Sequence, residues 1–296
     1  MVPSIEALTD DLRRLGVAAG DHILVRTAEN ATTRRAAANR ASAIVQALLD
    51  VVGPQGTVAA LTFSRGFLRP SKHPDKAFSL GSRSITGAFA EAVRTWPTAL
   101  RSRHPLNSFS AIGARAEELV RDHGPHSACF SPMEKLVEWR GKMLLIGCVS
   151  SSPGFSTVHL AQQHLGLSER NWMSGLKGTL WRDDDGTLHV FRPRDIPGCS
   201  AGFGKYYAEY VRRGVLSTGL VGDAYSIMVG CAEAYSIERE LLAKDPRSAL
   251  CSNPNCMACR ATLYYNKRDW LPYFLRNGRR FARQGWAQMQ GRRSPR

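Results

Sequence analysis

The stretch Lys142-Met-Leu-Leu-Ile-Gly-Cys-Val149 decides the fold class of this chain of 296 residues. Its apolar run predicts a strand, and a loop at Gly154–Thr157 then leads into a helix predicted over His159–Leu167. The same alternation of apolar strands and amphipathic helices continues on both sides of this stretch, without internal repeats. It predicts a single mixed α/β domain.

Further elements follow outward from this stretch. Apolar spacing predicts helices at Ile5–Leu15, Ala36–Val52, Thr86–Arg94, Ala114–His123, Phe203–Arg213 and Ala224–Leu242. Strands are predicted at His22–Arg26, Thr57–Phe63 and Phe109–Gly113, with a hairpin inside Thr179–Arg192. Ser64–Arg83 is predicted to be a loop over the site. We expect the α/β domain to span residues 1–245 and a helical, Cys-rich and basic extension to span 246–296.

Composition indicates a soluble globular protein, with 43 % hydrophobic and 22 % charged residues. No run of eighteen apolar residues predicts a membrane span, and the N-terminus lacks a signal-peptide pattern. Seven cysteines, an odd number, fit reduced thiols or metal ligands better than disulfides, so we expect a cytoplasmic protein.

The net charge of +15 is concentrated near the C-terminus. Residues 260–296 contain ten Lys and Arg residues against one acid, Asp269. Such a region suits an anionic partner such as a nucleotide cofactor, an acidic carrier protein or nucleic acid. A solvated basic end is the alternative.

Two histidines stand in settings that favour chemistry. His104 lies in Arg101-Ser-Arg-His-Pro-Leu-Asn-Ser108, where the proline favours an extended or turn conformation and the arginines provide positive charge. His159 lies in Ser156-Thr-Val-His-Leu-Ala161, near an expected helix start whose field keeps a histidine neutral. Either could instead be structural, His104 as a solvated surface residue and His159 in helix packing.

The order of several blocks resembles the aminoglycoside 3-N-acetyltransferase family, from about Leu12 to about Ala224. After an opening with Leu12, Val17, Gly20 and Asp21, the blocks are Ala47–Thr57, Gly87–Arg94, Arg101–Ser108, Ala111–Gly113, Ser131–Leu136, Gly141–Gly147 and Thr157–Ala161. The resemblance implies transfer of an acetyl or other acyl group from acetyl-CoA to an amine, without a covalent enzyme intermediate.

The resemblance also implies roles for individual residues. His159 falls on the family's motif histidine and would act as the base or its immediate partner. His104, with Arg101 and Arg103, would orient the thioester or phosphate. Contacts with the cofactor are expected from Arg26, Thr27, Arg101, Arg103, Ser108 and Thr157.

Three positions depart from the family pattern. Gln162 replaces a glutamate, and a glutamine cannot stabilise an imidazolium by charge. Either His159 is then a weaker base, or another acid, with Asp195 as the candidate, takes the place of the glutamate. Asn107 replaces a second histidine, and Arg26-Thr27-Ala28 replaces His-Ser-Ser near the cofactor. These changes favour an amino sugar or a secondary metabolite as acceptor over the substrates of aminoglycoside resistance.

Cys251-Ser-Asn-Pro-Asn-Cys256-Met-Ala-Cys259 places three thiols at a spacing that suits one metal ion. A fourth ligand would come from Cys231, Cys199 or a histidine. Zinc is expected over an iron–sulfur cluster, because the chain shows no other redox machinery. Three unrelated surface thiols are the alternative.

The last segment predicts a basic amphipathic helix. Its apolar face would contain Leu271, Phe274, Leu275, Gly278, Phe281, Ala282, Gly285 and Met289, with Arg276, Arg279, Arg280 and Arg283 elsewhere. This helix either docks on the domain or binds an acidic carrier protein or RNA, where Tyr264, Tyr265, Trp270 and Trp286 could stack on bases. There are two alternatives to an acyl-transfer enzyme. One is a protein that uses a bound metal ion or an iron–sulfur cluster for different chemistry. The other is a scaffold that only binds an acidic carrier protein or RNA.

Overall fold

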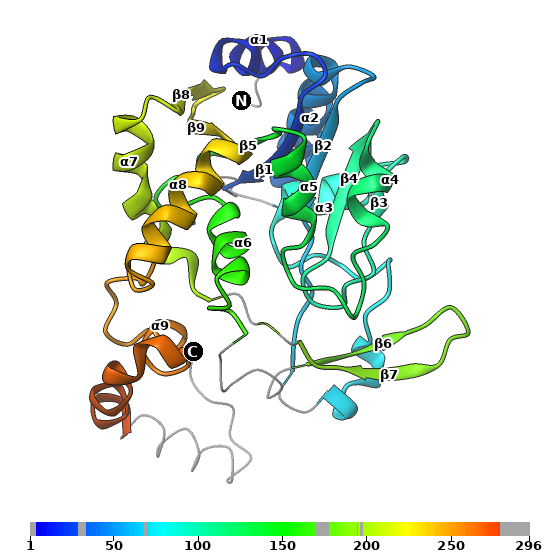
Figure 1. The fold of residues 1–296 in the computed structure, drawn as a ribbon. Helices are drawn as coiled ribbons and strands as arrows, with labels where there is room; N and C mark the ends of the chain where they lie inside the picture. Colours follow the sequence, from blue (N-terminus) through cyan, green and yellow to red (C-terminus); the bar gives the residue numbers. More distant parts are fainter. Residues whose placement is uncertain are drawn as a thin grey trace.

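The computed structural model describes residues 4–28, 34–67, 70–169, 178–193, 195 and 198–278. A seven-stranded mixed sheet forms its centre, in the order β3-β4-β2-β1-β5-β9-β8 (Figure 1). The strands are β1 (His22–Thr27), β2 (Thr57–Leu61), β3 (Leu100–Arg101), β4 (Phe109–Gly113), β5 (Lys142–Ile146), β8 (Leu216–Val221) and β9 (Ala224–Gly230). The prediction of a mixed α/β domain is confirmed.

The three central strands are parallel, because β1 pairs in parallel with both β2 and β5. The outer neighbours β4 and β9 run antiparallel to them. Alternate residues of β5 enter two different cores, with Met143 and Leu145 on one face and Leu144 and Ile146 on the other. A strand buried on both faces explains the continuous apolar run that decided the fold class.

Helices cover both faces of the sheet. The side chains of α1 (Ile5–Leu15), α2 (Arg34–Val52) and α3 (Ala88–Arg94) pack on one face. The other face is covered by α4 (Ala116–Val120), α5 (Pro132–Glu138), α6 (Thr157–His164), α7 (Tyr207–Arg212) and α8 (Cys231–Lys244). The result is a three-layer arrangement whose helices flank the parallel strands (Figure 1).

The remaining elements lie outside the central sheet. They are the 3₁₀ turns η1 (Pro70–Lys72), η2 (Pro74–Lys76), η3 (Ser200–Tyr206) and η4 (Tyr264–Asp269), the helix α9 (Met257–Arg260), and the hairpin β6 (Thr179–Arg182) and β7 (Leu188–Phe191). This hairpin was predicted, and it extends away from the sheet in Figure 1.

One predicted helix is wrong in its first part. Residues 224–230 form β9, paired with β8, and α8 begins only at Cys231. The turn between the strands contains Gly222 with φ of 63° and Asp223. A Gly-Asp turn between two apolar segments is a hairpin signal that outweighs the helical spacing.

The C-terminal extension differs from the predicted amphipathic helix. Residues 270–278 are helical, but Leu271 and Leu275 are 67 % and 75 % exposed, whereas Tyr273 and Asn277 are buried. The predicted apolar face is therefore not the docked face in this part. Phe281, Ala282, Gly285, Trp286 and Met289, with Arg279, Arg280 and Arg283, lie outside the described residues.

The predicted boundary at residue 245 stays a prediction. α8 ends at Lys244, close to it. However, Ser248 and Leu250 hydrogen-bond to η3, so the extension is attached to the domain. Among the described residues, no helix has the length and apolar content needed to cross a membrane.

Candidate active site

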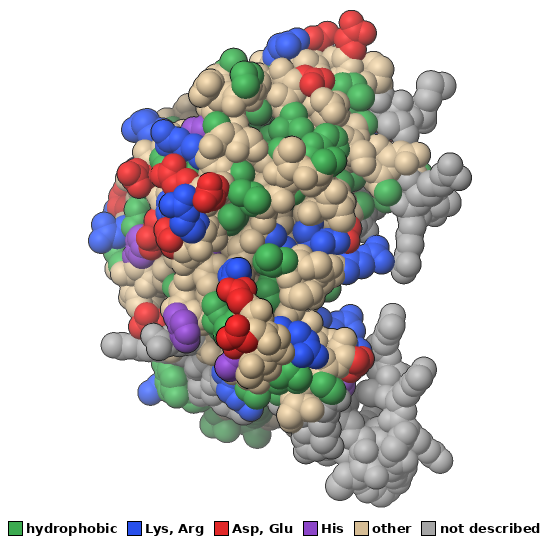
Figure 2. All heavy atoms as spheres, turned by 90° about the vertical axis from the view of Figure 1, so that its right-hand side faces the viewer, with side chains coloured by type: hydrophobic (Ala, Val, Ile, Leu, Met, Phe, Trp, Pro, Cys, Tyr) green, Lys and Arg blue, Asp and Glu red, His purple; other side chains and the backbone are tan. Residues whose placement is uncertain are grey.

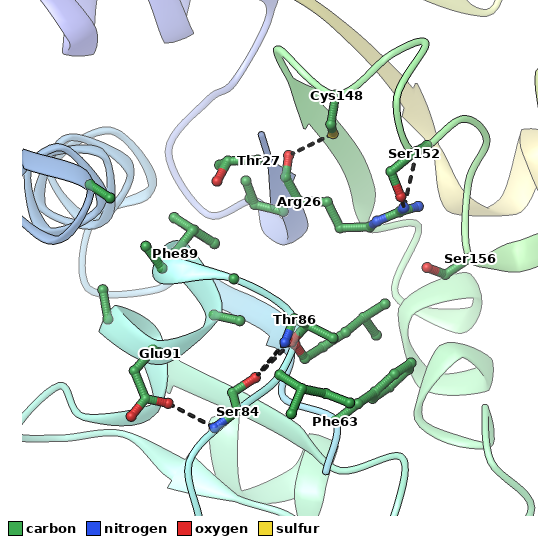
Figure 3. Close-up of a pocket in the computed structure, with 18 of the residues that line it drawn as sticks. Arg26, Thr27, Phe63, Ser84, Thr86, Phe89, Glu91, Cys148, Ser152 and Ser156 are labelled. Atoms are coloured by element: carbon green, nitrogen blue, oxygen red, sulfur yellow. Dashed lines mark hydrogen bonds between the residues drawn. The ribbon is translucent and has the colours of Figure 1, made fainter. Parts of the chain in front are cut away.

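A cavity of about 1230 Å³ lies at the carboxyl ends of the parallel strands. Its walls come from the end of β1, the segment after β2, the region before and within α3, and the loop after β5. Figure 3 shows Arg26, Cys148 and Ser152 on one wall, facing Phe63, Thr86 and Glu91 on the other. Ligand sites of parallel sheets form at this edge, because the connections after the strands meet there.

His159 lies on the cavity wall, on the first turn of α6. Its ring packs between the rings of Phe130 and Phe203, with centroid distances of 4.5 and 4.7 Å. Burial lowers the pKa of His159 to about 4, against a hydrogen bond to Gln162 that raises the pKa, and the charge of Arg26 lowers it further. The imidazole is therefore neutral at pH 7.

The structure brings Gln162 to His159, with 3.1 Å between Oε1 and Nδ1. A carbonyl oxygen only accepts hydrogen bonds, so Nδ1 donates its proton to Gln162. The lone pair then resides on Nε2. This tautomer is the one that a base on the cavity wall requires.

Arg26 and Thr27 also line the cavity, at the end of β1. The Arg26 guanidinium donates to the carbonyl oxygens of Gly154 at 2.9 Å and Ser152 at 3.0 Å, and to the Ser152 hydroxyl. These bonds hold the loop after β5 against the strand end (Figure 3). Burial lowers the pKa of Arg26, although the group stays a cation at neutral pH.

Arg101 is not among the residues that line the cavity, and its contacts do not support the predicted role as a cofactor ligand. All five of its N–H groups donate within the protein, which leaves none for a phosphate. One of the acceptors is Ser108, a buried residue that was also predicted to contact the cofactor. The acceptors are Ser108 Oγ, Ser64 Oγ and the carbonyl oxygens of Thr62, Leu80 and Ser82.

His104 and Arg103 also lie away from the cavity. His104 is 0 % exposed, stacks on His123 at 4.7 Å and accepts from the Asn107 N–H at 2.9 Å. Burial lowers its pKa to about 4. Arg103 faces solvent and pairs with Asp184 of the β6–β7 hairpin at 2.7 Å. These positions do not support the predicted contacts with a thioester or phosphate, which stay predictions.

Thr157 and Asp195 are buried behind the site. The Thr157 hydroxyl donates to Glu238 at 2.9 Å instead of facing the cavity. The Asp195 carboxylate accepts from the Cys129 N–H at 3.2 Å, and burial raises the pKa of Asp195. Asp195 is not among the described contacts of His159. The residue that hydrogen-bonds to the His159 ring is Gln162.

The sequence reasoning did not identify the cavity-lining residues of the loop after β5 and of the segment before α3. Cys148, Ser152 and Ser156 follow directly on the strand that decided the fold class, and Ser84 and Thr86 face them across the cavity. The rule that ligands bind at the carboxyl ends of parallel strands was the available signal. Phe130 and Phe203, which enclose His159, had no such signal.

The three cysteines predicted as metal ligands lie together at one place in the extension, with Cys199 as a fourth. The Sγ atoms of Cys199, Cys251, Cys256 and Cys259 are all within 4.8 Å of one another. Cys231, the alternative fourth ligand, is instead buried in the main core at the start of α8.

Comparison with known proteins gives the same picture. The family model described as aminoglycoside 3-N-acetyltransferase matches residues 33–243. Aminoglycoside N(3)-acetyltransferase VII of Streptomyces paromomycinus is 32 % identical over 200 residues, which cover 56 % of this chain and 67 % of that protein. Aminoglycoside N(3)-acetyltransferase III of Acinetobacter baumannii is 29 % identical over 244 residues, covering 74 % and 84 %.

A solved structure also matches. It is described as AAC-IIIb in a binary complex with CoASH, and it superposes with a TM-score of 0.68 at 27 % identity, covering 82 % of this chain and 97 % of that one. The family match covers most of the chain, and the fold and the histidine on the cavity wall agree with it. The chain belongs to the aminoglycoside 3-N-acetyltransferase family and is an acyltransferase.

Proposed function

We propose that this protein transfers an acetyl group from acetyl-CoA to the amine of an amino sugar or an amino-bearing secondary metabolite. The observation that carries this proposal is the neutral imidazole of His159 on the wall of a large cavity. The likeness to a structure described with CoASH supports the cofactor.

In the proposed reaction, the deprotonated amine attacks the thioester carbonyl carbon and the C–S bond breaks. As the C–N bond forms, the nitrogen becomes acidic, so even a base with a pKa of about 4 can take its proton. His159 Nε2 would accept this proton, which then passes to the leaving thiolate or to solvent. Holding both reactants in one cavity contributes about 7–11 kcal/mol to such a rate.

The charges of the cavity argue for an acceptor with few positive charges. Its described lining contains Arg26, Arg65 and Arg83 but a single acid, Glu91. Glu91 already pairs with Arg94 at 2.7 Å and accepts from the Ser84 N–H. On the face shown in Figure 2, the surface has an indentation, and Lys and Arg side chains (blue) gather beside it. We infer that arginines of the lining hold the phosphates of CoA, because guanidinium groups bind phosphate well.

Release of free thiol from acetyl-CoA, measured with a panel of amines, tests the proposal. We expect turnover with a mono- or diamino sugar and a lower kcat/KM with polycationic aminoglycosides. His159→Gln should lower kcat by about 10²–10⁴-fold, since general-base catalysis supplies that much. The buried His123→Gln serves as the control substitution. Turnover unaffected by His159→Gln would contradict the assignment of the base.

The rival functions receive less support. Four cysteines around one point leave no open coordination position, which is typical of structural metal sites and not of catalytic ones. The carrier-protein or RNA partner would bind through a segment that lies largely outside the described residues. A cytoplasmic location is part of the proposal, because none of the seven cysteines, all within the described residues, forms a disulfide.

A further inference from the structure

Four cysteines from two distant parts of the chain meet at one point. Cys251, Cys256 and Cys259 come from the extension, whereas Cys199 precedes η3 in the α/β domain. Their Sγ atoms lie within 4.8 Å of one another. A tetrahedral zinc site with Zn–S distances of about 2.3 Å places its sulfurs about 3.8 Å apart, so little movement is needed to close the site.

The size of this thiol cluster favours a single ion. Several iron atoms between the thiolates would hold the sulfurs further apart than one ion does. Four thiolates in a tetrahedral arrangement select zinc among the common divalent ions. The ion would be enclosed, because Cys251 and Cys259 are buried and the other two are half-buried.

The polar surroundings of the thiol cluster suit thiolates. The backbone N–H of Ala201 points to Cys199 Sγ at 3.4 Å, and that of Cys251 points to Cys259 Sγ at 3.5 Å. Arg260 donates to the Cys251 carbonyl oxygen and pairs with Asp269 at 2.8 Å. A zinc ion with four thiolates carries two negative charges, which N–H groups and a nearby guanidinium stabilise.

The extension has little else to fold around. Its core consists of Leu250, Cys251, Cys259 and Leu263, so two of the four buried members are thiol ligands themselves. Apart from the attachment of Ser248 and Leu250 to η3, this small apolar cluster contributes little to ordering the segment, and small units of this kind often depend on a metal or on disulfides. The cysteines of this cluster are free, which leaves the metal.

The thiol cluster is connected to the cavity through η3. Cys199 immediately precedes Ser200 and Phe203, which line the cavity, and the Phe203 ring contacts His159 at 4.7 Å. A Cβ on Gly202 would lie 2.3 Å from the Ala249 carbonyl oxygen, so η3 and the extension are in backbone contact. The Lys205 ammonium also donates to the Leu250 carbonyl oxygen at 2.6 Å.

We infer that Cys199, Cys251, Cys256 and Cys259 bind one zinc ion, and that this ion fixes η3 so that Phe203 is held against His159. The site is structural, and it links the extension to one wall of the cavity. This inference goes beyond the proposed acetyl transfer and does not depend on it.

Metal analysis of the full chain, purified without metal-affinity steps, tests the ion. We expect about one zinc ion per chain in the wild type. Cys199→Ala should lose the zinc, whereas Cys231→Ala removes a buried thiol elsewhere and should keep it. If Cys199→Ala does not fold, Cys256→Ala at a half-buried ligand replaces it. Stoichiometric iron, a wild type without metal, or zinc retained in both ligand variants would overturn the site.

Hydrogen exchange tests the link to the cavity without any assay of activity. Removal of zinc by a chelator should speed exchange in residues 199–206 at least about tenfold, because their attachment is lost. Exchange in β5 should stay unchanged, which serves as the internal control. Unchanged exchange in residues 199–206 would overturn the positioning role. Failure of acetyl transfer alone would leave both results intact.

Discussion

The partner of His159 determines how strongly its ring attracts a proton, and here that partner is the neutral amide of Gln162. A carboxylate at this position would stabilise the imidazolium and raise the pKa of His159 by about 1–3 units. The neutral ring is the base, so we expect the acidic limb of the kcat/KM profile, expressed per unprotonated amine, to lie near pH 4 in the wild type.

We therefore expect Gln162→Glu to move this limb to higher pH by about one unit or more and to raise the rate at the plateau. A pH–rate profile with acetyl-CoA and the best amine measures both effects. Gln163→Glu places the same charge one residue further along α6 and should leave the limb in place. Identical profiles for wild type and Gln162→Glu would mean that residue 162 does not tune the base.

Arg101 illustrates a residue whose type suggested ligand binding but whose contacts are structural. Its guanidinium joins the segment after β2 to the β3–β4 region, and burial lowers its pKa to about 10. A lysine offers three donors without the planar geometry, so some of the acceptors would lose their partner.

Arg101→Lys should therefore lower the free energy of unfolding by about 2–3 kcal/mol, since each unsatisfied buried acceptor costs about 1–3 kcal/mol. Arg103→Lys is the matched control, because Arg103 is exposed and its ion pair with Asp184 is worth about 0–1 kcal/mol. Denaturant unfolding of both variants measures the difference. Equal stabilities would refute the structural role of Arg101.

At the scale of elements, Glu238 joins three helices. Its Oε1 accepts from Thr157 of α6 at 2.9 Å and from Tyr210 of α7, while Glu238 itself lies on α8. Burial raises the pKa of Glu238 from 4.5 to about 8, so the carboxyl is protonated at neutral pH. The folded state then binds one more proton than the unfolded state between pH 4.5 and about 8.

This group's contribution to stability is therefore full below pH 4.5 and decreases as the pH rises to about 8. Glu238→Gln removes the titration, so the variant should gain stability relative to the wild type as pH rises, by on the order of a few kcal/mol at pH 8.5. Urea unfolding at pH 5 and 8.5 tests this expectation. Glu240→Gln, on the exposed side of the same helix, should show no such gain. A constant difference between the two pH values would contradict the raised pKa.

The elements also show where sequence reasoning succeeds and fails. A strand that is buried on both faces, such as β5, has a continuous apolar run that is easily recognised in the sequence. The strand β4 was predicted with its observed bounds, Phe109–Gly113. The β8–β9 hairpin was missed because the helical spacing of residues 224–242 was given more weight than the turn signal of Gly222 and Asp223. The positions of two predicted site residues were not foreseen either. Arg101 and His104 had the right chemistry, but tertiary contacts directed them into the core.

At the scale of the whole molecule, the extension contains two parts with different expected roles. The four cysteines and the contacts with η3 all lie before residue 279. The segment beyond, 279–296, contains six arginines and no acidic residue. A chain that ends at residue 278 should therefore keep its zinc, its thermal stability and its acetyl transfer. A chain that ends at residue 247 should lose all three, because it lacks three of the four thiols and the contacts of Ser248 and Leu250 with η3.

A binding assay with RNA tests whether the basic segment 279–296 has a function of its own, apart from the cavity. If the six arginines contact phosphates, affinity for RNA should fall steeply with salt, and the slope should be smaller in the chain that ends at residue 278. Fluorescence anisotropy with a labelled single strand at several salt concentrations measures both. Equal slopes for the two chains would show that the basic segment makes no phosphate contacts. The excess of positive charge would then serve solubility alone.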